Sequence, residues 1–409
     1  MERTIIHLDV ADFAAAVECL LDRRLAGRPL IIAPGGAARA VVYDMNETAF
    51  QCGVRKGMAV RRALRRCPDA RLRPPRMERY EQAMQALLQP ALACSPRVEC
   101  GDADGHLFVD VTGTGRLLGP AMDVAWRLER RIRADLGFEP AWSVASSKLM
   151  AKVATRLVKP RGECIVGAGE EAAFLAPLPL RLLPGIENRD LAILDALNLA
   201  FVRQAASLSR EQLGALFGSR AAFVHDVLRG IDPSPVRPAG SASPTVTAHW
   251  HFGNDSNDAV VVESALYALA EQAGWQLRRQ RLAARRLRIT IDYSDGRRRT
   301  GHAAAPGATS DNRSLFEIAC RVLQRIWTRR VRIRHLGFYC ERLVFPPAQL
   351  DLFADRHYPN RKHYRLSAAV DRIRERFGRQ AIDVGRVLAL KDLPAAGQCA
   401  VPLLPGVPA

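Results

Sequence analysis

Three lysines stand close together in a chain whose other basic residues are nearly all arginine. Only six of the 60 basic residues are lysine, and Lys148, Lys152 and Lys159 fall within one stretch of twelve residues. Lys148 and Lys152 are four residues apart, so they would share one face of a helix. Because a compact ammonium group suits a triphosphate as a point charge, these lysines are candidate triphosphate-binding residues. A solvated helix face is the alternative.

Asp9 is the second candidate, because it ends a strand predicted over residues 4–10. A helix is predicted over 13–21, and a strand over 106–112 carries Asp110. An aspartate at a strand end is commonly a capping or surface residue, and a metal ligand is the other possibility. Mixed strands and helices with acids near strand ends predict an α+β domain up to about residue 170.

Hydrophobic periodicity and turn residues predict the other elements of this half. Strands are expected at 29–33 and 40–43, and helices at 61–67, 79–92, 117–136 and 147–158. Residues 172–237 predict short helices and no strand. Within them, Gly185 and Ile186 lie in a glycine turn between two small helices. Such a turn can aim backbone N–H groups at a phosphate, so these two residues are candidate DNA-binding positions.

Residues 243–348 predict a second α+β unit, after a segment rich in proline, serine and glycine. The expected order is strand 245–252, helix 260–278, strand 287–293, helix 313–327 and strand 331–345, which predicts a twisted sheet backed by two helices. Four arginines alternate on two of these strands and would share a sheet face: Arg286, Arg288, Arg332 and Arg334. Beside a phosphate-binding turn they predict a cradle for a nucleic-acid backbone.

The overall charge also favours a polyanionic partner. The formal net charge is +18 and the isoelectric point is about 10.2. Residues 243–347 alone hold 17 arginines against nine acidic residues. A basic surface binds nucleic acid favourably because it neutralises phosphates and releases their counterions, so nucleic acid is the expected partner. A merely soluble arginine-rich enzyme is the alternative, since an arginine bias can follow from genome composition.

Several classes of protein are disfavoured. An apolar content of 48% with 25% charged residues argues against a mostly disordered chain. No run of about 18 apolar residues predicts a membrane span, and the charged first residues do not fit a signal peptide. Nine cysteines without a C-x-x-C pair predict neither a zinc site nor a disulfide scaffold. A soluble, cytoplasmic protein without a membrane partner is expected, associated with the nucleoid when bound to DNA.

Short motifs in a fixed order make the chain resemble the Y-family DNA polymerases of DinB/UmuC type, over about residues 4–385. The motifs are His7–Asp9 with Phe13 and Val17–Glu18, Asp110–Gly113, Ser146–Lys148, Ala151–Lys152, Lys159–Gly162, Pro184–Ile186, Gly230–Asp232 and Arg334–Gly337. The resemblance implies an α+β multidomain, right-hand-like fold. Its domains would be a palm (1–18 and 78–170), fingers (19–77), a thumb with a helix-hairpin-helix (171–237), a linker (238–242) and a little finger (243–348).

The resemblance also implies a two-metal centre that this sequence departs from. The family supplies one aspartate from its first motif and an Asp-Glu pair from its second, and the pair falls on Gly105 and His106. Asp104 is one residue away and Asp102 three away. Four further family positions carry Ala11, Ala14, Glu47 and Phe50. Because imidazole is a poor ligand for Mg²⁺ and Glu47 would repel a triphosphate, we expect a catalytically degenerate, ImuB-like member.

A clamp-binding motif is predicted after the last domain. Gln349, Leu350, Asp351, Leu352 and Phe353 fit the Q-L-x-L-F pattern of bacterial sliding-clamp ligands, in which apolar side chains fill pockets and the glutamine makes directed hydrogen bonds. These apolar residues could instead pack on the last domain. A helix over 365–377, whose apolar residues form one stripe, and a mobile tail are expected within 354–409.

Three hypotheses follow from the sequence. The first is a clamp-tethered, DNA-binding accessory of bacterial translesion synthesis that needs no cofactor and works beside a separate polymerase. The second is an active, divergent polymerase that uses Mg²⁺ at Asp9, Asp104 and Asp102. The third is a general nucleic-acid binder whose tail folds back on its own last domain.

Overall fold

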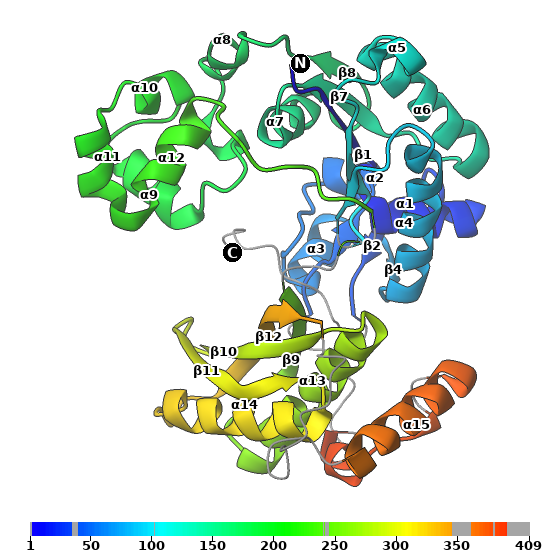
Figure 1. Ribbon diagram of the computed structural model, residues 1–409, viewed down its shortest axis with the longest axis vertical. Coiled ribbons are helices and arrows are strands. Elements are labelled where there is room, and N and C mark those ends of the chain that lie inside the picture. The colour runs from blue at the N-terminus through cyan, green and yellow to red at the C-terminus, as the bar shows by residue number, and fades with distance from the viewer. Residues whose placement is uncertain are drawn as a thin grey trace, which may run out of the picture. The chain divides into compact units, whose positions relative to one another are not determined.

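The computed structural model describes residues 2–34, 40–101, 103–239, 241, 245–345, 361–378 and 381–390. These residues form two compact units, one built mainly from residues before 242 and the other mainly from residues after it (Figure 1). Within the described part of the chain, no helix is long and apolar enough to cross a membrane.

A five-stranded sheet with the order β5-β6-β1-β7-β8 organises the first unit. Its central strand β1 (Ile5–Asp9) is fully buried and antiparallel to both neighbours. The other strands are β5 (Val98–Cys100), β6 (His106–Asp110), β7 (Ala141–Ala145) and β8 (Glu163–Ile165). The predicted strands at 4–10 and 106–112 are therefore confirmed, although they end on Asp9 and Asp110, one and two residues earlier than expected.

Helices cover both faces of this sheet, and the alternation along β1 decides which residues meet which helices. Ile6 and Leu8 pack toward α1 (Phe13–Leu21), α4 (Met77–Leu92) and α6 (Ala121–Leu136). Ile5 packs toward α7 (Lys148–Val158) on the other face. Because His7 and Asp9 share the parity of Ile5, they belong to the α7 face. The predicted helix 13–21 is confirmed, and Ser147 caps α7 as the prediction of 147–158 implies.

A three-stranded sheet and a group of short helices complete the first unit. The sheet consists of β3 (Asp44–Met45), β2 (Leu30–Ile32) and β4 (Arg71–Arg73), with α2 (Glu47–Gln51) and α3 (Val60–Arg66) beside it. The predicted strand at 40–43 is wrong, because the strand pairing begins at Asp44. The short helices are α5 (Gly115–Leu118), α8 (Glu171–Leu175), α9 (Asn188–Ala196), α10 (Val202–Ala206), α11 (Arg210–Phe217) and α12 (Ala221–Leu228).

The second unit is an antiparallel sheet with the order β11-β10-β12-β9. Its strands are β9 (Thr245–Ser256), β10 (Ala283–Tyr293), β11 (Arg298–Thr309) and β12 (Ile333–Val344). The helices α13 (Ala259–Arg279) and α14 (Asn312–Ile326) pack against one face through the apolar core. The expected sheet backed by two helices is confirmed. The edge strand β11 was not predicted, since its run of Arg, Gly, Ala and His lacks apolar alternation.

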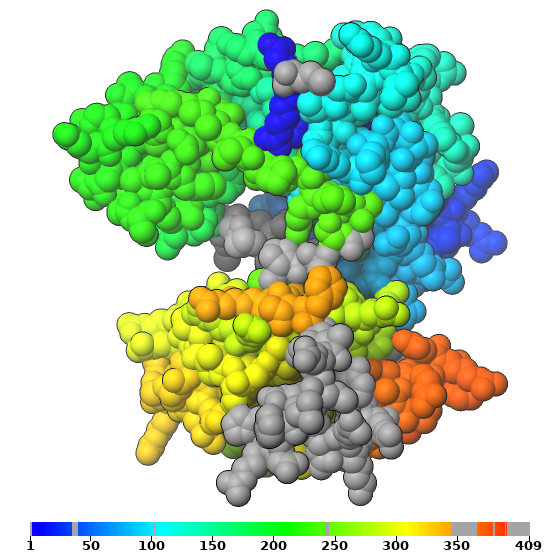
Figure 2. All heavy atoms as spheres, in the orientation of Figure 1, coloured from blue at the N-terminus to red at the C-terminus, as the bar shows by residue number. Residues whose placement is uncertain are grey.

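A C-terminal helix, α15 (Arg361–Phe377), joins the second unit through ion pairs. Arg278 of α13 holds Asp371 through two hydrogen bonds of 2.7 and 3.0 Å, and Arg374 lies 3.1 Å from Glu271. All four side chains are largely buried. Of the apolar stripe expected on this helix, Leu366, Ile373 and Phe377 are exposed, whereas Val370 is half-buried. Figure 2 shows the helix on the surface of the second unit (orange).

Candidate functional site

Asp9 lies at the end of the central strand, 7% exposed, on the face that α7 covers. Its carboxylate is 2.7 Å from the ammonium of Lys159, which directly follows α7. Across the sheet, Asp9 is in register with His106 on β6 and with Ala141 on β7. The neighbour of Asp9 on β6 is thus an imidazole, and the carboxylate of Asp9 is already paired with Lys159.

Gly105, which precedes β6, leaves no room for a side chain. Its φ is +84°, which favours glycine, and its carbonyl accepts a hydrogen bond from Val10. A Cβ atom at this position would lie 2.7 Å from Cβ of Phe13, at the start of α1. A carboxylate at position 105 is therefore excluded by both the backbone conformation and the packing of α1.

Asp104 is held within its own hairpin between β5 and β6. Its carboxylate accepts a hydrogen bond of 2.7 Å from Nδ1 of His106 and lies over Gly101, at the position a Cβ there would occupy. Burial would raise the pKa of Asp104, but the hydrogen bond and charge of His106 outweigh it and hold that pKa below its usual range. Asp102, the other nearby acid expected from the sequence, lies outside the described residues.

Helix α7 brings basic side chains to this centre, although not all three predicted lysines. Lys152 interacts electrostatically with Asp9 and Asp104, and burial together with Arg156 lowers its pKa. Lys148 instead lies 2.9 Å from Glu99 on β5, which also accepts two hydrogen bonds from Arg237. Lys152 and Lys159 are therefore together near Asp9, whereas Lys148 fastens α7 to another strand.

Two acidic residues meet at the start of α1: Asp12 directly precedes the helix, and Asp44 lies on β3 of the small sheet. Asp44 is 3% exposed, accepts a hydrogen bond from the backbone of Ala14 and lies 2.7 Å from the ammonium of Lys56. Burial and the charge of Asp44 raise the pKa of Asp12 to about 6, despite Lys56 at 3.8 Å. Sequence reasoning missed Asp44 and Lys56. The scarcity of lysine that singled out the other three also marks Lys56.

These side chains do not fit a pair of magnesium ions. Such a pair needs several carboxylates within reach of both ions. Here Asp9 and Asp104 are each bound to a basic side chain of the chain, and position 105 cannot carry an acid. Among the described residues, no group of three or more His, Cys, Asp or Glu side chains is placed to hold a metal ion.

The predicted glycine turn lies ahead of α9. Gly185 has a φ of +82°, and a Cβ there would lie 2.5 Å from the ring of Phe223, so only glycine fits. The amino end of α9 itself is already capped, because Asp190 accepts a hydrogen bond of 3.0 Å from the backbone of Glu187. A phosphate at this turn would therefore contact Gly185 and Ile186 rather than the capped helix end.

The predicted arginine row divides into two groups. Arg286 and Arg288 on β10 lie on the face opposite α13 and α14, and both contact Glu341, at 3.5 and 2.6 Å. Arg332 precedes β12, and Arg334 donates a hydrogen bond of 2.8 Å to the backbone of Ser294 at the hairpin turn. Arg332 and Arg334 flank the buried Ile333 and are both exposed, beside a register shift between Ile333 and His335, so one face shared by all four arginines stays a prediction.

Comparisons with known proteins agree with this architecture. Models of the impB/mucB/samB family match residues 8–156, and those of its C-terminal domain match residues 245–352. A protein named DNA polymerase IV from Caulobacter vibrioides is 31% identical over 388 residues, covering 94% of each chain. One from Dehalococcoides mccartyi is 29% identical over 392 residues, covering 96% of this chain and 99% of the relative.

The chain belongs to the Y family, of DinB/UmuC type. Solved structures show the same fold. A Y-family chimera of Dbh and Dpo4 has a TM-score of 0.72 at 19% identity, and DinB from Sulfolobus solfataricus has 0.59 at 20% identity. Each match covers 84% of this chain and all of the solved one. The family and the right-hand-like fold implied by the sequence motifs are confirmed.

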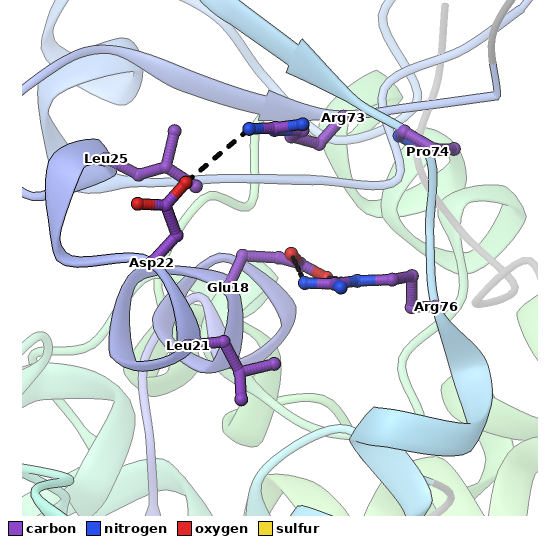
Figure 3. A pocket seen from close by; sticks show the side chains of 7 residues that line it. All are labelled: Glu18, Leu21, Asp22, Leu25, Arg73, Pro74 and Arg76. Atoms are coloured by element: carbon purple, nitrogen blue, oxygen red, sulfur yellow. Dashed lines mark hydrogen bonds and ion pairs between the residues drawn. The ribbon is translucent and has the colours of Figure 1, made fainter.

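A cavity of about 230 Å³ in this Y-family chain lies away from Asp9, beside the carboxyl half of α1. Figure 3 shows that two carboxylates in it, Glu18 and Asp22, already point at arginines. Arg76 and Tyr80 both donate hydrogen bonds to Glu18, and Arg73 lies 3.5 Å from Asp22. Glu18 therefore ties α1 to α4, and its motif position has a structural explanation. The clamp motif 349–353 lies outside the described residues.

Proposed function

We propose that this protein is a non-catalytic, DNA-binding accessory of bacterial translesion synthesis that binds the sliding clamp. In this proposal it works at the nucleoid beside a separate polymerase. The parts of the chain keep their family roles: palm (1–18 and 78–170), fingers (19–77), thumb (171–237) and little finger (243–348). The family membership supports a role at DNA, and the centre around Asp9 supports the loss of chemistry.

The observation that carries the proposal is the pairing of Asp9 with His106, next to a glycine that has no room for a carboxylate. A hard cation such as Mg²⁺ takes oxygen ligands, and a pair of such ions needs several carboxylates. Here the second strand offers an imidazole, and Lys159 occupies the carboxylate of the first at 2.7 Å. A second ion would also face Lys152, whose charge already interacts with both remaining acids.

Primer extension tests the lack of chemistry. The full chain is incubated with a labelled primer-template, all four dNTPs, and Mg²⁺ or Mn²⁺, with a replicative polymerase as the positive control. We expect no extension by the wild type. Extension that disappears in the Asp9→Ala variant would overturn the proposal in favour of the second hypothesis, an active polymerase using Mg²⁺ at Asp9 and Asp104. Extension that persists in Asp9→Ala indicates a contaminating polymerase, and a repurified sample must then show none.

The proposed DNA contacts are Gly185 and Ile186 at the thumb turn and Arg286, Arg288, Arg332 and Arg334 in the last domain. Nucleic-acid binding through such contacts depends on salt, with a slope of about −0.9 per neutralised phosphate on duplex DNA. We expect a steep slope for the wild type in fluorescence anisotropy with a primer-template. Salt-independent or absent binding would contradict the proposal.

Clamp binding is proposed for Gln349, Leu350, Asp351, Leu352 and Phe353. The apolar members would fill pockets on the clamp, whereas Asp351 occupies the variable position of the pattern. We expect Leu352→Ala combined with Phe353→Ala to abolish binding to an immobilised clamp. Asp351→Ala is the matched control and should bind like the wild type. Unchanged affinity of the double variant would favour the general nucleic-acid binder.

We propose that Lys152 and Lys159 still contact an anion, while Lys148 keeps its structural pairing with Glu99. Burial beside Arg156 disfavours the charge of Lys152, and an anion relieves this repulsion. Calorimetric titration with a dNTP tests the point, with and without Mg²⁺. Binding that Lys152→Met weakens and Lys148→Met leaves unchanged is the expected result. Absence of any heat for wild type would show that the anion site is lost too.

A further inference from the structure

The face of the four-stranded sheet opposite α13 and α14 carries polar and aromatic side chains in register. One row crosses all four strands, with directly paired residues from β9, β12, β10 and β11: His251, His335, Asp292 and Arg298. The next row contains His249, Gly337 and Thr290, and the row after that contains Tyr339 and Arg288. Three imidazoles, a phenol and two guanidinium groups therefore gather on one face.

A continuous chain of hydrogen bonds runs through this face. Arg298 donates two hydrogen bonds to Asp292, at 2.5 and 2.7 Å. Asp292 Oδ2 is 3.0 Å from His335 Nδ1, and His335 Nε2 is 3.1 Å from His249 Nδ1. The ring of His251 stacks on His335 with centroids 4.4 Å apart. The chain begins at an arginine and ends at His249, whose Nε2 has no hydrogen-bond partner among the described residues.

Gly337 makes the arrangement possible. A Cβ there would lie 2.8 Å from the ring of Tyr339 and would also meet the hydroxyl of Thr290, so Tyr339 leans over the glycine. Tyr339 meets His249 edge to face, with ring centroids 5.3 Å apart at 86°. Cζ of Arg288 lies 3.7 Å from the ring centre of Tyr339, and Glu341 holds the same guanidinium at 2.6 Å. The hydroxyl of Thr290 is buried without a hydrogen-bond partner in the described part of the chain.

The hydrogen bonds from Asp292 through His335 to His249 determine which ring nitrogen of His249 carries the proton. The two arginine bonds and the His335 bond outweigh burial and lower the pKa of Asp292, so this carboxylate only accepts. In its neutral form His335 must then donate through Nδ1 and accept through Nε2. His249 donates to it through Nδ1, which leaves Nε2 of His249 as an acceptor.

The charges around His249 agree with a neutral ring. Burial, His335, Arg298 and Arg288 lower its pKa to about 4, while Asp292 acts in the other direction. Burial and the two neighbouring imidazoles likewise lower the pKa of His251 to about 3. An acceptor nitrogen repels phosphate oxygens, so this edge does not suit the nucleic-acid backbone. It suits an N–H donor, and the rings beside it suit a flat partner.

We propose that His249, Tyr339 and Arg288 form a binding patch for an unpaired nucleobase that carries an exocyclic amino group. The amino group donates to Nε2 of His249, and the base stacks on the Tyr339 and Arg288 surface. The patch rests on the proposed binding of DNA and adds recognition of single-stranded bases to the contacts with phosphate. It would discriminate cytosine from thymine, two pyrimidines that differ at this donor.

Binding of single strands to the full chain tests the patch. Labelled oligo(dC) and oligo(dT) of equal length are titrated at pH 8 and fixed salt, and anisotropy gives both dissociation constants. We expect oligo(dC) to bind about threefold to tenfold more tightly, as one net hydrogen bond allows. His249→Ala should remove the preference by weakening oligo(dC) alone. Thr247→Ala, on the same face of β9, is the matched control and should keep it.

A second variant keeps the proposal falsifiable if His249→Ala does not fold. Tyr339→Leu should weaken both oligonucleotides about fivefold or more, because a stacking surface is lost. Equal binding of oligo(dC) and oligo(dT) by the wild type overturns the base patch and leaves the proposed function standing. A wild type that binds neither single strands nor primer-template overturns the proposed function as well.

Discussion

Two groups of acidic side chains in this protein differ in how many cations accompany them. Around the start of α1, Asp12 and Asp44 share Lys56, and burial with their mutual repulsion raises the pKa of Asp12 to about 6. On the sheet face of the second unit opposite α13 and α14, Asp292 has both Arg298 and His335, and its pKa is lowered despite burial. The same residue type thus responds in opposite directions, because the supply of partners differs.

The two regions also differ in how their acidic side chains are paired with basic ones. Near α1 and Asp9, Lys56 and Lys159 are each paired with an aspartate of the chain. On the sheet face opposite α13 and α14, Asp292 and Glu341 hold arginines and an imidazole in place. The first arrangement pairs lysines with acids around the start of α1 and the end of β1, whereas the second lines up arginines and imidazoles on one sheet face.

The largest expected effect on stability comes from placing an acid at position 105. Gly105→Asp would place a side chain at a φ of +84° and against Phe13. We expect a loss of roughly 2–4 kcal/mol in the free energy of unfolding, from overpacking and backbone strain. Urea unfolding measures it. His106→Glu is the matched control, since a side chain already stands there, and it should cost clearly less. Equal losses would contradict the steric explanation.

Removing the charge of Asp292 should lower the free energy of unfolding by less than Gly105→Asp does. Asp292→Asn weakens the bonds from Arg298 and His335, and we expect a loss of about 1–2 kcal/mol at pH 7. Because the pKa of Asp292 is lowered in the fold, its contribution is present at neutral pH and fades only as the pH falls below about 4. Unfolding at pH 7 and pH 3 checks this. A difference that grows on acidification would show the sign to be wrong.

The raised pKa of Asp12 predicts the opposite pH dependence. A raised carboxyl pKa contributes stability at low pH that is lost as the pH rises through about 6. Asp12→Asn resembles the protonated form and tolerates the positive φ of this position. We expect it to gain about 2 kcal/mol at pH 8 and nothing at pH 4. Asp135→Asn, on the exposed side of α6, is the control and should show no such gain.

The smallest expected effect concerns Arg332. This exposed arginine precedes β12 and makes no side-chain ion pair among the described residues. Arg332→Ala should weaken primer-template binding about threefold and reduce the salt slope by about 1, with stability unchanged. Anisotropy at several salt concentrations measures both. A changed affinity with an unchanged slope would mean that Arg332 does not contact phosphate.

Local patterns predicted the elements well, but not the partners of the charged side chains. The helix 13–21 and the strand ending at Asp9 follow from periodicity, and motif order predicted the family. Lys148 was grouped with Lys152 by helix spacing, yet it pairs with Glu99, 49 residues away. The cation that accompanies Asp44 and the edge strand β11 were equally invisible. Long-range pairing and edge position depend on the assembled fold, which spacing within one element does not encode.

Two largely buried ion pairs join α15 to α13, Arg278 with Asp371 and Arg374 with Glu271. The C-terminal helix thus belongs to the second unit through charges rather than through its apolar residues. Removing α15 would leave Arg278 and Glu271 without these partners. Because a buried charge that loses its partner is costly, the second unit depends on this helix for its stability.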